Sequence, residues 1–373
     1  MSLAISSLAA AHSDISPADS ISPTQFDGAV AWPLALDAAL PDSIRPDAIQ
    51  PDAIQPYAIR GEIVRKLTLR HAGERELRIA YECQGPIGAP VVIVAGGISA
   101  HRHVAAHPSD TSPGWWDAQV GPGGAIDSKR LRVLAIDWLG ADGTLDAPID
   151  SADQADAIVA VLDVLGIARV GAFIGASYGA MVGLQFAARH RSRVNHLVAI
   201  SGAHRPHPFA SAWRALQRNI VRSGIADPHA ALSLARQLAM LSYRTPEEFA
   251  ERFKAAPRVE AGRVHCDAED YLAVCGERYA QRWSTTAFLR LSESVDLHAI
   301  DPATVRVPST LVAVSEDRLV PSTDIHAMAE KLGARRQVHH LRSRYGHDAF
   351  LKEDRRIGEI LREALTDCCG GAA

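Results

Sequence analysis

The chain of 373 residues lacks the signals that mark membrane, secreted and nucleic-acid-binding proteins. No apolar run reaches the roughly 18 uncharged residues that a membrane span requires. The first five residues, Met1 to Ile5, carry none of the positive charge that opens a secretory signal. Basic residues are not in excess, because the formal net charge is -4, which argues against a dedicated nucleic-acid binder. We therefore expect no membrane partner and no nucleic acid.

Cysteines are few, and their spacing excludes the usual cysteine-based frameworks. There are five, no C-x-x-C occurs, and two of them form the adjacent pair Cys368-Cys369. An odd number without regular spacing does not indicate disulfides or a zinc site. The hydrophobic content of 47% is sufficient for a sizeable core without covalent cross-links. These features predict a cytoplasmic globular protein.

The first sixty residues differ in composition from the rest. A five-residue repeat places proline at positions 41, 46, 51 and 56. Proline at that spacing excludes a helix and any central strand. We predict that residues 1–60 are a largely disordered leader without a catalytic group. The last residues, 368–373, are expected to form a frayed tail.

From residue 61 the pattern is that of an α/β protein. An expected hairpin turns around His71-Ala72-Gly73-Glu74, and short apolar runs alternate with helical periodicity. One helix is expected to begin at Ser151, with Gln154 completing a capping box. The runs lie at 91–94, 131–136, 170–174, 197–200 and 309–314. Such runs suit strands that are buried on both faces, so we predict a doubly wound, mostly parallel sheet.

The predicted core is interrupted once. Residues 204–300 show helical patterns and no convincing strand. We therefore assign residues 61–203 and 301–367 to the α/β core, and residues 204–300 to a helical lid inserted over it. The fold class expected from this arrangement is an α/β-hydrolase fold with a lid insertion.

The motif Gly175-Ala176-Ser177-Tyr178-Gly179 follows an apolar strand and precedes a helical stretch. In that context the small residues allow a sharp turn that exposes the serine hydroxyl at the edge of the sheet. The first N–H groups of the helix can then stabilise a developing negative charge. Taken alone, the motif could also be an ordinary strand-to-helix turn.

A serine nucleophile requires a base, and the base requires an orienting acid. Asp317 follows the apolar run 309–314, and His347 lies thirty residues further on. The chain order serine, aspartate, histidine is that of α/β-hydrolases. Glu316 is the rival acid, but we favour Asp317 because a turn follows it. The predicted triad is therefore Ser177, Asp317 and His347.

The oxyanion hole is expected to use two backbone N–H groups. One belongs to Tyr178, which follows the nucleophile. The second is assigned to Gly97 or Ile98, in a glycine-containing loop that follows the run 91–94. Adjacent glycines let a backbone approach the tetrahedral oxygen closely.

Three histidines, His101, His103 and His107, lie close together in the sequence. No acidic residue falls among them, and the spacing of the three fits no helical pair cleanly. We expect loop histidines near the mouth of the active site and no metal.

Two longer motifs carry a family resemblance. The first is Gly114-Trp115-Trp116-Asp117, which continues into Val120-Gly121-Pro122-Gly123-Gly124; the second is Gly346-His347-Asp348-Ala349-Phe350. With Gln217-Arg218-Asn219-Ile220 they make residues 61–366 resemble the homoserine O-acyltransferases of methionine biosynthesis.

That resemblance implies a ping-pong acyl transfer to L-homoserine, with Arg218 and Asp348 binding the amino-acid substrate. A guanidinium suits the α-carboxylate and a carboxylate suits the α-ammonium. No bound cofactor is expected; acyl-CoA, as acetyl-CoA or succinyl-CoA, would be the co-substrate. Serine as acceptor, an esterase that uses water, and assembly as a homodimer stay open. A non-catalytic binding protein is less favoured, since no triad residue is missing.

Overall fold

The computed structural model describes residues 57–224 and 227–369, and the proline repeat up to residue 56 lies outside them. An eight-stranded sheet forms the centre, in the order β1-β2-β6-β3-β7-β8-β11-β12. The strands are β1 (Ala58–Leu69), β2 (Gly73–Gln84), β3 (Val91–Ala95), β6 (Arg132–Ile136), β7 (Val170–Ala176), β8 (Val194–Ile200), β11 (Ser309–Val314) and β12 (Arg336–Leu341). From β6 to β12 all neighbours are parallel.

The antiparallel part of the sheet is the predicted hairpin together with the pairing of β2 with β6. β1 pairs with β2 from Ala58 opposite Gln84 to Leu69 opposite Gly73. The strand therefore includes the last three residues of the predicted leader, 58–60. The reason is local: Ala58, Ile59 and Arg60 follow the last proline of the repeat, so their N–H groups are available to the ladder.

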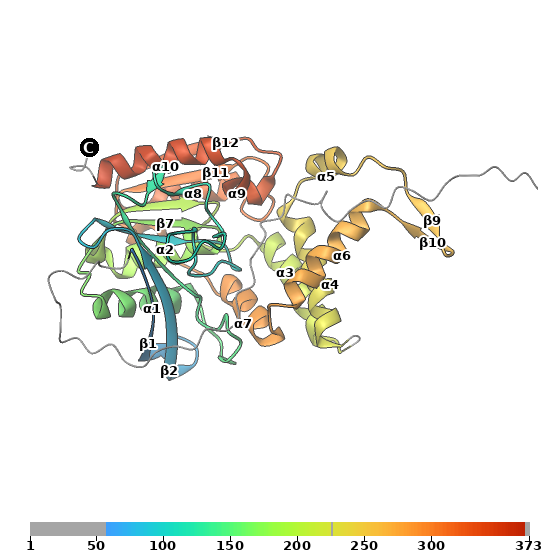
Figure 1. The fold of residues 1–373 in the computed structure, drawn as a ribbon, viewed down its shortest axis with the longest axis horizontal. Helices are drawn as coiled ribbons and strands as arrows, with labels where there is room; N and C mark the ends of the chain where they lie inside the picture. The colour runs from blue at the N-terminus through green and yellow to red at the C-terminus, as the bar shows by residue number, and fades with distance from the viewer. Residues whose placement is uncertain (1–56, 225–226, 370–373) are drawn as a thin grey trace, which may run out of the picture.

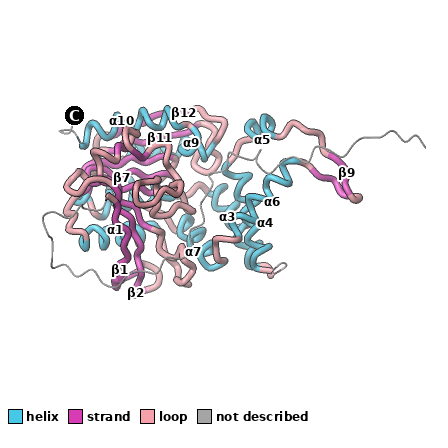
Figure 2. Tube along the Cα trace, in the orientation of Figure 1, coloured by secondary structure: helices cyan, strands magenta, loops and turns pink. Residues whose placement is uncertain are grey.

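Helices cover both faces of the sheet, as Figure 2 shows. The helices are α1 (Ser151–Val164), α2 (Tyr178–Arg189), α8 (Ser322–Lys331) and α10 (Asp354–Cys369). One buried cluster contains apolar residues of α1, α2 and α8, and another contains those of α10. The two clusters lie on opposite faces because side chains alternate along each strand. The predicted doubly wound α/β-hydrolase fold is confirmed.

α1 begins at Ser151 as expected, but its capping box lies one residue earlier than predicted. Asp150 is the N-cap, and its side chain accepts from the N–H groups of Ala152 and Asp153. Asp153 completes the capping box. Gln154 instead binds the backbone of Leu139 through its amide oxygen and nitrogen. An aspartate at the N-cap competes well with serine, so a box beginning at Ser151 is not formed.

The lid is the insertion between β8 and β11, and it lies to the right of the sheet in Figure 1. Its helices are α3 (Pro208–Arg222), α4 (Pro228–Tyr243), α5 (Pro246–Arg252), α6 (Asp267–Ala280) and α7 (Thr285–Asp296). The expectation of no strand was wrong. β9 (Arg258–Glu260) and β10 (Arg263–His265) form a hairpin. Strands of three residues are too short to produce a detectable alternation.

Short elements complete the described chain: β4 (Val120–Gly121), β5 (Ile126–Asp127), the 3₁₀ turns η2 (Arg191–Arg193), η3 (Pro302–Thr304) and η4 (Gly346–Asp348), and α9 (Ala349–Lys352). Within residues 57–224 and 227–369, no helix has the length and apolar character needed to cross a bilayer.

Candidate active site

Ser177 occupies a strained turn between β7 and α2. Its backbone has φ 55° and ψ -116°, a conformation that non-glycine residues rarely adopt and that active sites often retain. The flanking glycines make the turn possible. A Cβ at Gly175 would lie 2.2 Å from the carbonyl oxygen of Gly179, and one at Gly179 would lie 2.1 Å from that of Ala95. The motif therefore needs glycine at both positions.

The three predicted triad residues meet at the ends of β7, β11 and β12. His347 Nε2 lies 2.7 Å from Ser177 Oγ, and His347 Nδ1 lies 2.7 Å from Asp317 Oδ2. Both distances are those of hydrogen bonds, and the imidazole and the aspartate are buried. The arrangement can move a proton from the serine hydroxyl to the imidazole.

Asp317, rather than Glu316, is the acid that contacts the histidine. The second oxygen of Asp317 accepts from the N–H groups of Leu319 and Val320, each at 2.9 Å. Glu316 accepts from the N–H of Ser343 at 2.7 Å instead. The turn beyond Asp317 thus fixes the orientation of its carboxylate.

Two opposing causes act on the pKa of His347. Burial lowers it, while the charge and the hydrogen bond of Asp317 raise it, with a smaller contribution from Asp348. The outcome is a pKa above the ordinary value of 6.5. Such an imidazole binds a proton more readily than a free one, which favours a general base.

The loop after β3 faces the nucleophile. A Cβ at Gly97 would come within 4.0 Å of the Ser177 Cβ. The carbonyl oxygen of Gly97 accepts from the indole N–H of Trp138 at 3.0 Å and from the N–H of Ala100 at 2.9 Å. Because a trans peptide directs its N–H away from its C=O, the N–H of Ile98 points away from Trp138.

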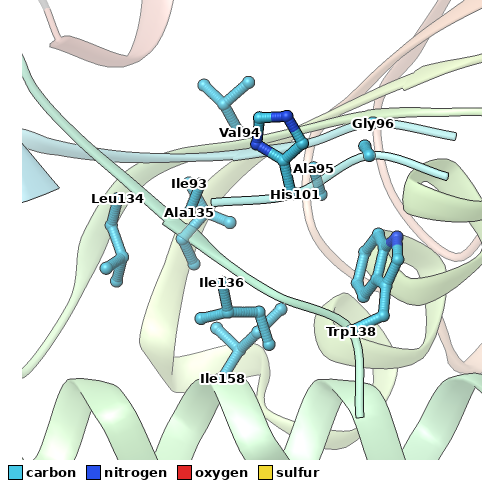
Figure 3. A pocket seen from close by; sticks show the side chains of 11 residues that line it. Ile93, Val94, Ala95, Gly96, His101, Leu134, Ala135, Ile136, Trp138 and Ile158 are labelled. Carbon is cyan, nitrogen blue, oxygen red and sulfur yellow. The ribbon is translucent and has the colours of Figure 1, made fainter. Parts of the chain in front are cut away.

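A small cavity lies behind this loop, between β3, β6 and α1. Figure 3 shows His101 and Trp138 beside the apolar side chains that line it. Its volume of about 10 Å³ is close to the space that one water molecule needs. It is therefore too small for a substrate.

A larger cavity of about 70 Å³ opens above Ser177 and His347. The core contributes Ile98 and Tyr178 to its wall, and the lid contributes Arg214, Gln217, Arg236, Tyr243 and Tyr279. The reacting hydroxyl thus lies at the boundary between core and lid, and most of the charged wall comes from the lid.

Arg218 is not among the residues that line this cavity. Its guanidinium lies 2.7 Å from Asp296 and 3.0 Å from the hydroxyl of Ser292. Arg214, one turn earlier on α3, does line the cavity and binds the same Asp296 at 2.6 Å. Two guanidinium groups therefore share one carboxylate, and Arg218 lies behind Arg214.

Asp348 follows His347 directly but is likewise not among the lining residues. Its carboxylate lies 3.0 Å from Arg244 Nε, and Arg244 also binds Glu248 at 2.6 Å. Asp348 therefore lies behind the imidazole, where its charge favours the protonated form of His347.

Sequence reasoning missed two arginines of the cavity wall, Arg214 and Arg236. A signal for Arg214 was present, because it lies four residues before Arg218 and so shares its helix face. Arg236 offered no comparable motif.

The predicted loop histidines do not lie at the mouth of the cavity. His103 and His107 are buried, and both contact the carboxylate of Glu82 from β2, at 2.9 and 3.2 Å. The potential ligand atoms of these three residues lie within 4.8 Å of one another. The acid that the local sequence lacked therefore comes from another strand. Arg60 also binds Glu82, so a guanidinium already supplies the positive charge there.

Residues 90–354 match the family described as the alpha/beta hydrolase fold. The homoserine O-succinyltransferase of Xanthomonas campestris pv. campestris is 60% identical over 307 residues, which cover 82% of this chain and 83% of that protein. The homoserine O-acetyltransferase of Symbiobacterium thermophilum is 30% identical over 348 residues, which cover 79% of this chain and 91% of that protein.

Among solved structures, homoserine O-acetyltransferase from Bacillus anthracis superposes with a TM-score of 0.75 at 18% identity. The superposition covers 83% of this chain and 98% of that one. A likeness at that identity concerns the fold, whereas the sequence matches concern the family. The chain belongs to the homoserine O-acyltransferases of the α/β-hydrolase family.

Proposed function

We propose that the protein transfers an acyl group from acyl-CoA to the hydroxyl of L-homoserine, and so supplies an O-acylhomoserine for methionine biosynthesis. The observation that carries this proposal is the continuous hydrogen-bonded path from Ser177 through His347 to Asp317, at the base of a cavity with a cationic wall. The family of the chain supports the acceptor.

In the first half-reaction, His347 Nε2 takes the proton of Ser177 as its oxygen attacks the thioester carbon. The N–H groups of Tyr178 and Ile98 stabilise the tetrahedral oxyanion. The carbon–sulfur bond then breaks, and the leaving thiolate receives the proton from His347. The products are acyl-Ser177 and coenzyme A, and the enzyme holds no bound cofactor.

In the second half-reaction, His347 takes the proton of the homoserine hydroxyl, whose oxygen attacks the acyl-enzyme. The bond to Ser177 breaks, and the serine oxygen recovers the proton. Transfer rather than hydrolysis requires that the lid orient the acceptor and limit the access of water.

The acceptor is a zwitterion, and the two predicted binding residues are proposed to act on its two charges. Arg214, with Arg218 and Asp296 behind it, forms a cluster with one net positive charge that suits the α-carboxylate. Asp348 is proposed to take the α-ammonium, which requires its carboxylate to turn from Arg244 toward the cavity. Serine carries the same two charges and is the alternative acceptor.

A donor and acceptor panel tests the proposal. Purified protein is mixed with acetyl-CoA or succinyl-CoA, and with L-homoserine, L-serine or no acceptor. Thiol release is followed, and the amino-acid product is identified by mass spectrometry. O-acylhomoserine formation supports the transferase, whereas acceptor-independent thiol release together with rapid p-nitrophenyl acetate hydrolysis would identify an esterase. Fractionation of cells tests the cytoplasmic location of the protein. Size-exclusion chromatography of the purified protein tests the homodimer.

A further inference from the structure

Arg236 is a cation of the active-site cavity for which the proposed acceptor binding has no use. It lies on α4 and lines the cavity together with Ser177 and His347. Its guanidinium carbon lies 4.9 Å from the ring centre of Tyr279 and 5.3 Å from that of Tyr243. The two rings hold the guanidinium by cation–π contact.

Three other arginines near the cavity have acidic partners. Arg214 and Arg218 share Asp296, and Arg244 contacts Glu248 and Asp348. Among the described residues, none gives Arg236 a carboxylate partner within ion-pair distance. A guanidinium held between aromatic rings without a counter-ion is suited to bind an anionic ligand.

The position of Arg236 limits which anion it can meet. Tyr243, which contacts Arg236, also stacks on the His347 imidazole with ring centres 6.1 Å apart. One tyrosine therefore separates the guanidinium from the catalytic base. The phosphates of coenzyme A are kept away from the thioester by the long pantetheine arm, and the α-carboxylate of homoserine is assigned to the Arg214 wall. A carboxylate at the far end of a short acyl chain fits the remaining position.

We infer that Arg236 determines the acyl donor by binding the terminal carboxylate of a dicarboxylic acyl group such as succinyl. This inference rests on the proposed function, since it names the donor of that same site. Arg236 acts on substrate binding and takes no part in proton transfer. The aromatic rings of Tyr243 and Tyr279 keep its planar fork in one orientation, which favours a bidentate contact.

The test compares donors in Arg236→Met, which keeps much of the side-chain length and removes the charge. We expect kcat/KM for succinyl-CoA to fall about 10- to 150-fold, the loss of a hydrogen bond to a charged group. The value for acetyl-CoA should stay within about twofold, and so should the KM of homoserine. Arg191→Gln, which removes a charge from an exposed position on η2, is the matched control and should change neither donor.

Equal losses with both donors would overturn the inference, because they would indicate contact with coenzyme A itself or a structural role. A rise confined to the KM of homoserine would overturn it in favour of acceptor binding. If Arg236→Met does not fold, the wild-type enzyme is assayed with the succinyl and acetyl thioesters of N-acetylcysteamine, which lack phosphates. A preference for the succinyl over the acetyl thioester supports the inference, and no preference contradicts it. Absence of transfer from every donor would instead reject the proposed function.

Discussion

The indole N–H of Trp138 donates a hydrogen bond of 3.0 Å to the carbonyl oxygen of Gly97. The same indole meets the ring of Tyr178 edge to face, with centres 5.0 Å apart. One side chain thus contacts both segments that would supply oxyanion donors. Trp138 is a positioning residue, because it fixes the peptide between Gly97 and Ile98 without lining the cavity above Ser177.

Trp138→Phe should lower kcat about tenfold, less than the 10²- to 10³-fold cost of removing an oxyanion donor outright. The ring contact with Tyr178 is kept, so the KM values should change little. Steady-state kinetics measure both. The control is Trp116→Phe, which loses an indole hydrogen bond to Phe350 in the cluster on the opposite face of the sheet. A similar loss of kcat in both variants would show that the loss comes from general destabilisation and not from the position of the peptide between Gly97 and Ile98.

Ser177→Ala should abolish acyl transfer, with a loss of about 10⁴- to 10⁶-fold in kcat. Its unfolding midpoint should stay equal to or above that of the wild type, since alanine removes only a hydroxyl from a strained turn. Mass spectrometry of protein incubated with acyl-CoA should find an acyl adduct on the wild type alone. An adduct of the same mass on the variant, or a rate within tenfold of wild type, would remove Ser177 from the nucleophile role.

The pH dependence should report the raised pKa of His347. The base must be neutral, so kcat/KM should fall as the pH decreases through a value above 6.5, the ordinary pKa of histidine. Asp317→Asn removes the charge that raises this pKa, while the burial that lowers it remains. The acidic limb should therefore move to lower pH as the maximal rate falls by about 10⁴-fold. An unmoved limb would mean that another group controls it.

The cluster on α3 and α7 should behave as a unit. Arg218→Ala leaves Asp296 bound to Arg214 alone, and removes the net positive charge of the cluster. We expect a rise of about 10- to 100-fold in the KM of homoserine, with acylation of Ser177 close to wild type in burst measurements. Arg214→Ala should cost at least as much, and the double variant less than the product of the two losses.

Arg222→Ala is the control for that series, because Arg222 lies on the same helix face but pairs with Glu293. Equal damage to acylation and to transfer in Arg218→Ala would assign this arginine a structural role. The lid would then have no demonstrated role in binding the amino-acid acceptor.

Glu82→Gln should destabilise the fold by about 3–5 kcal/mol, the usual cost of removing one partner from a buried ion pair. Glu82 is 2% exposed and contacts Arg60, His103 and His107. Urea unfolding measures the change. Glu62→Gln on the same hairpin breaks the exposed pair with Arg78 and should cost less than about 1 kcal/mol. Equal effects would show that the buried cluster adds no stability.

The features that could be predicted from the sequence are those that depend on local residue patterns and on the order of elements along the chain. The turn at Ser177 follows from two glycines between a strand and a helix, and the order of Asp317 and His347 follows from chain topology. The wall of the cavity could not be predicted in this way. Arg236 reaches it because α4 and α6 bring Arg236, Tyr243 and Tyr279 together, and such contacts between distant segments leave no periodic trace in the sequence. The partnership of Glu82 with His103 and His107 was hidden for the same reason.

The catalytic triad and the charged wall of the cavity belong to different stretches of the chain. Ser177, Asp317 and His347 follow strands of the central sheet, whereas Arg214, Arg236, Tyr243 and Tyr279 all lie within the insertion between β8 and β11. A gene could therefore acquire a new donor or acceptor preference through substitutions in this one contiguous segment, with the proton-transfer machinery untouched. Relatives named for succinyl and for acetyl transfer occur in this family, and a division of labour of this kind allows such divergence in few evolutionary steps.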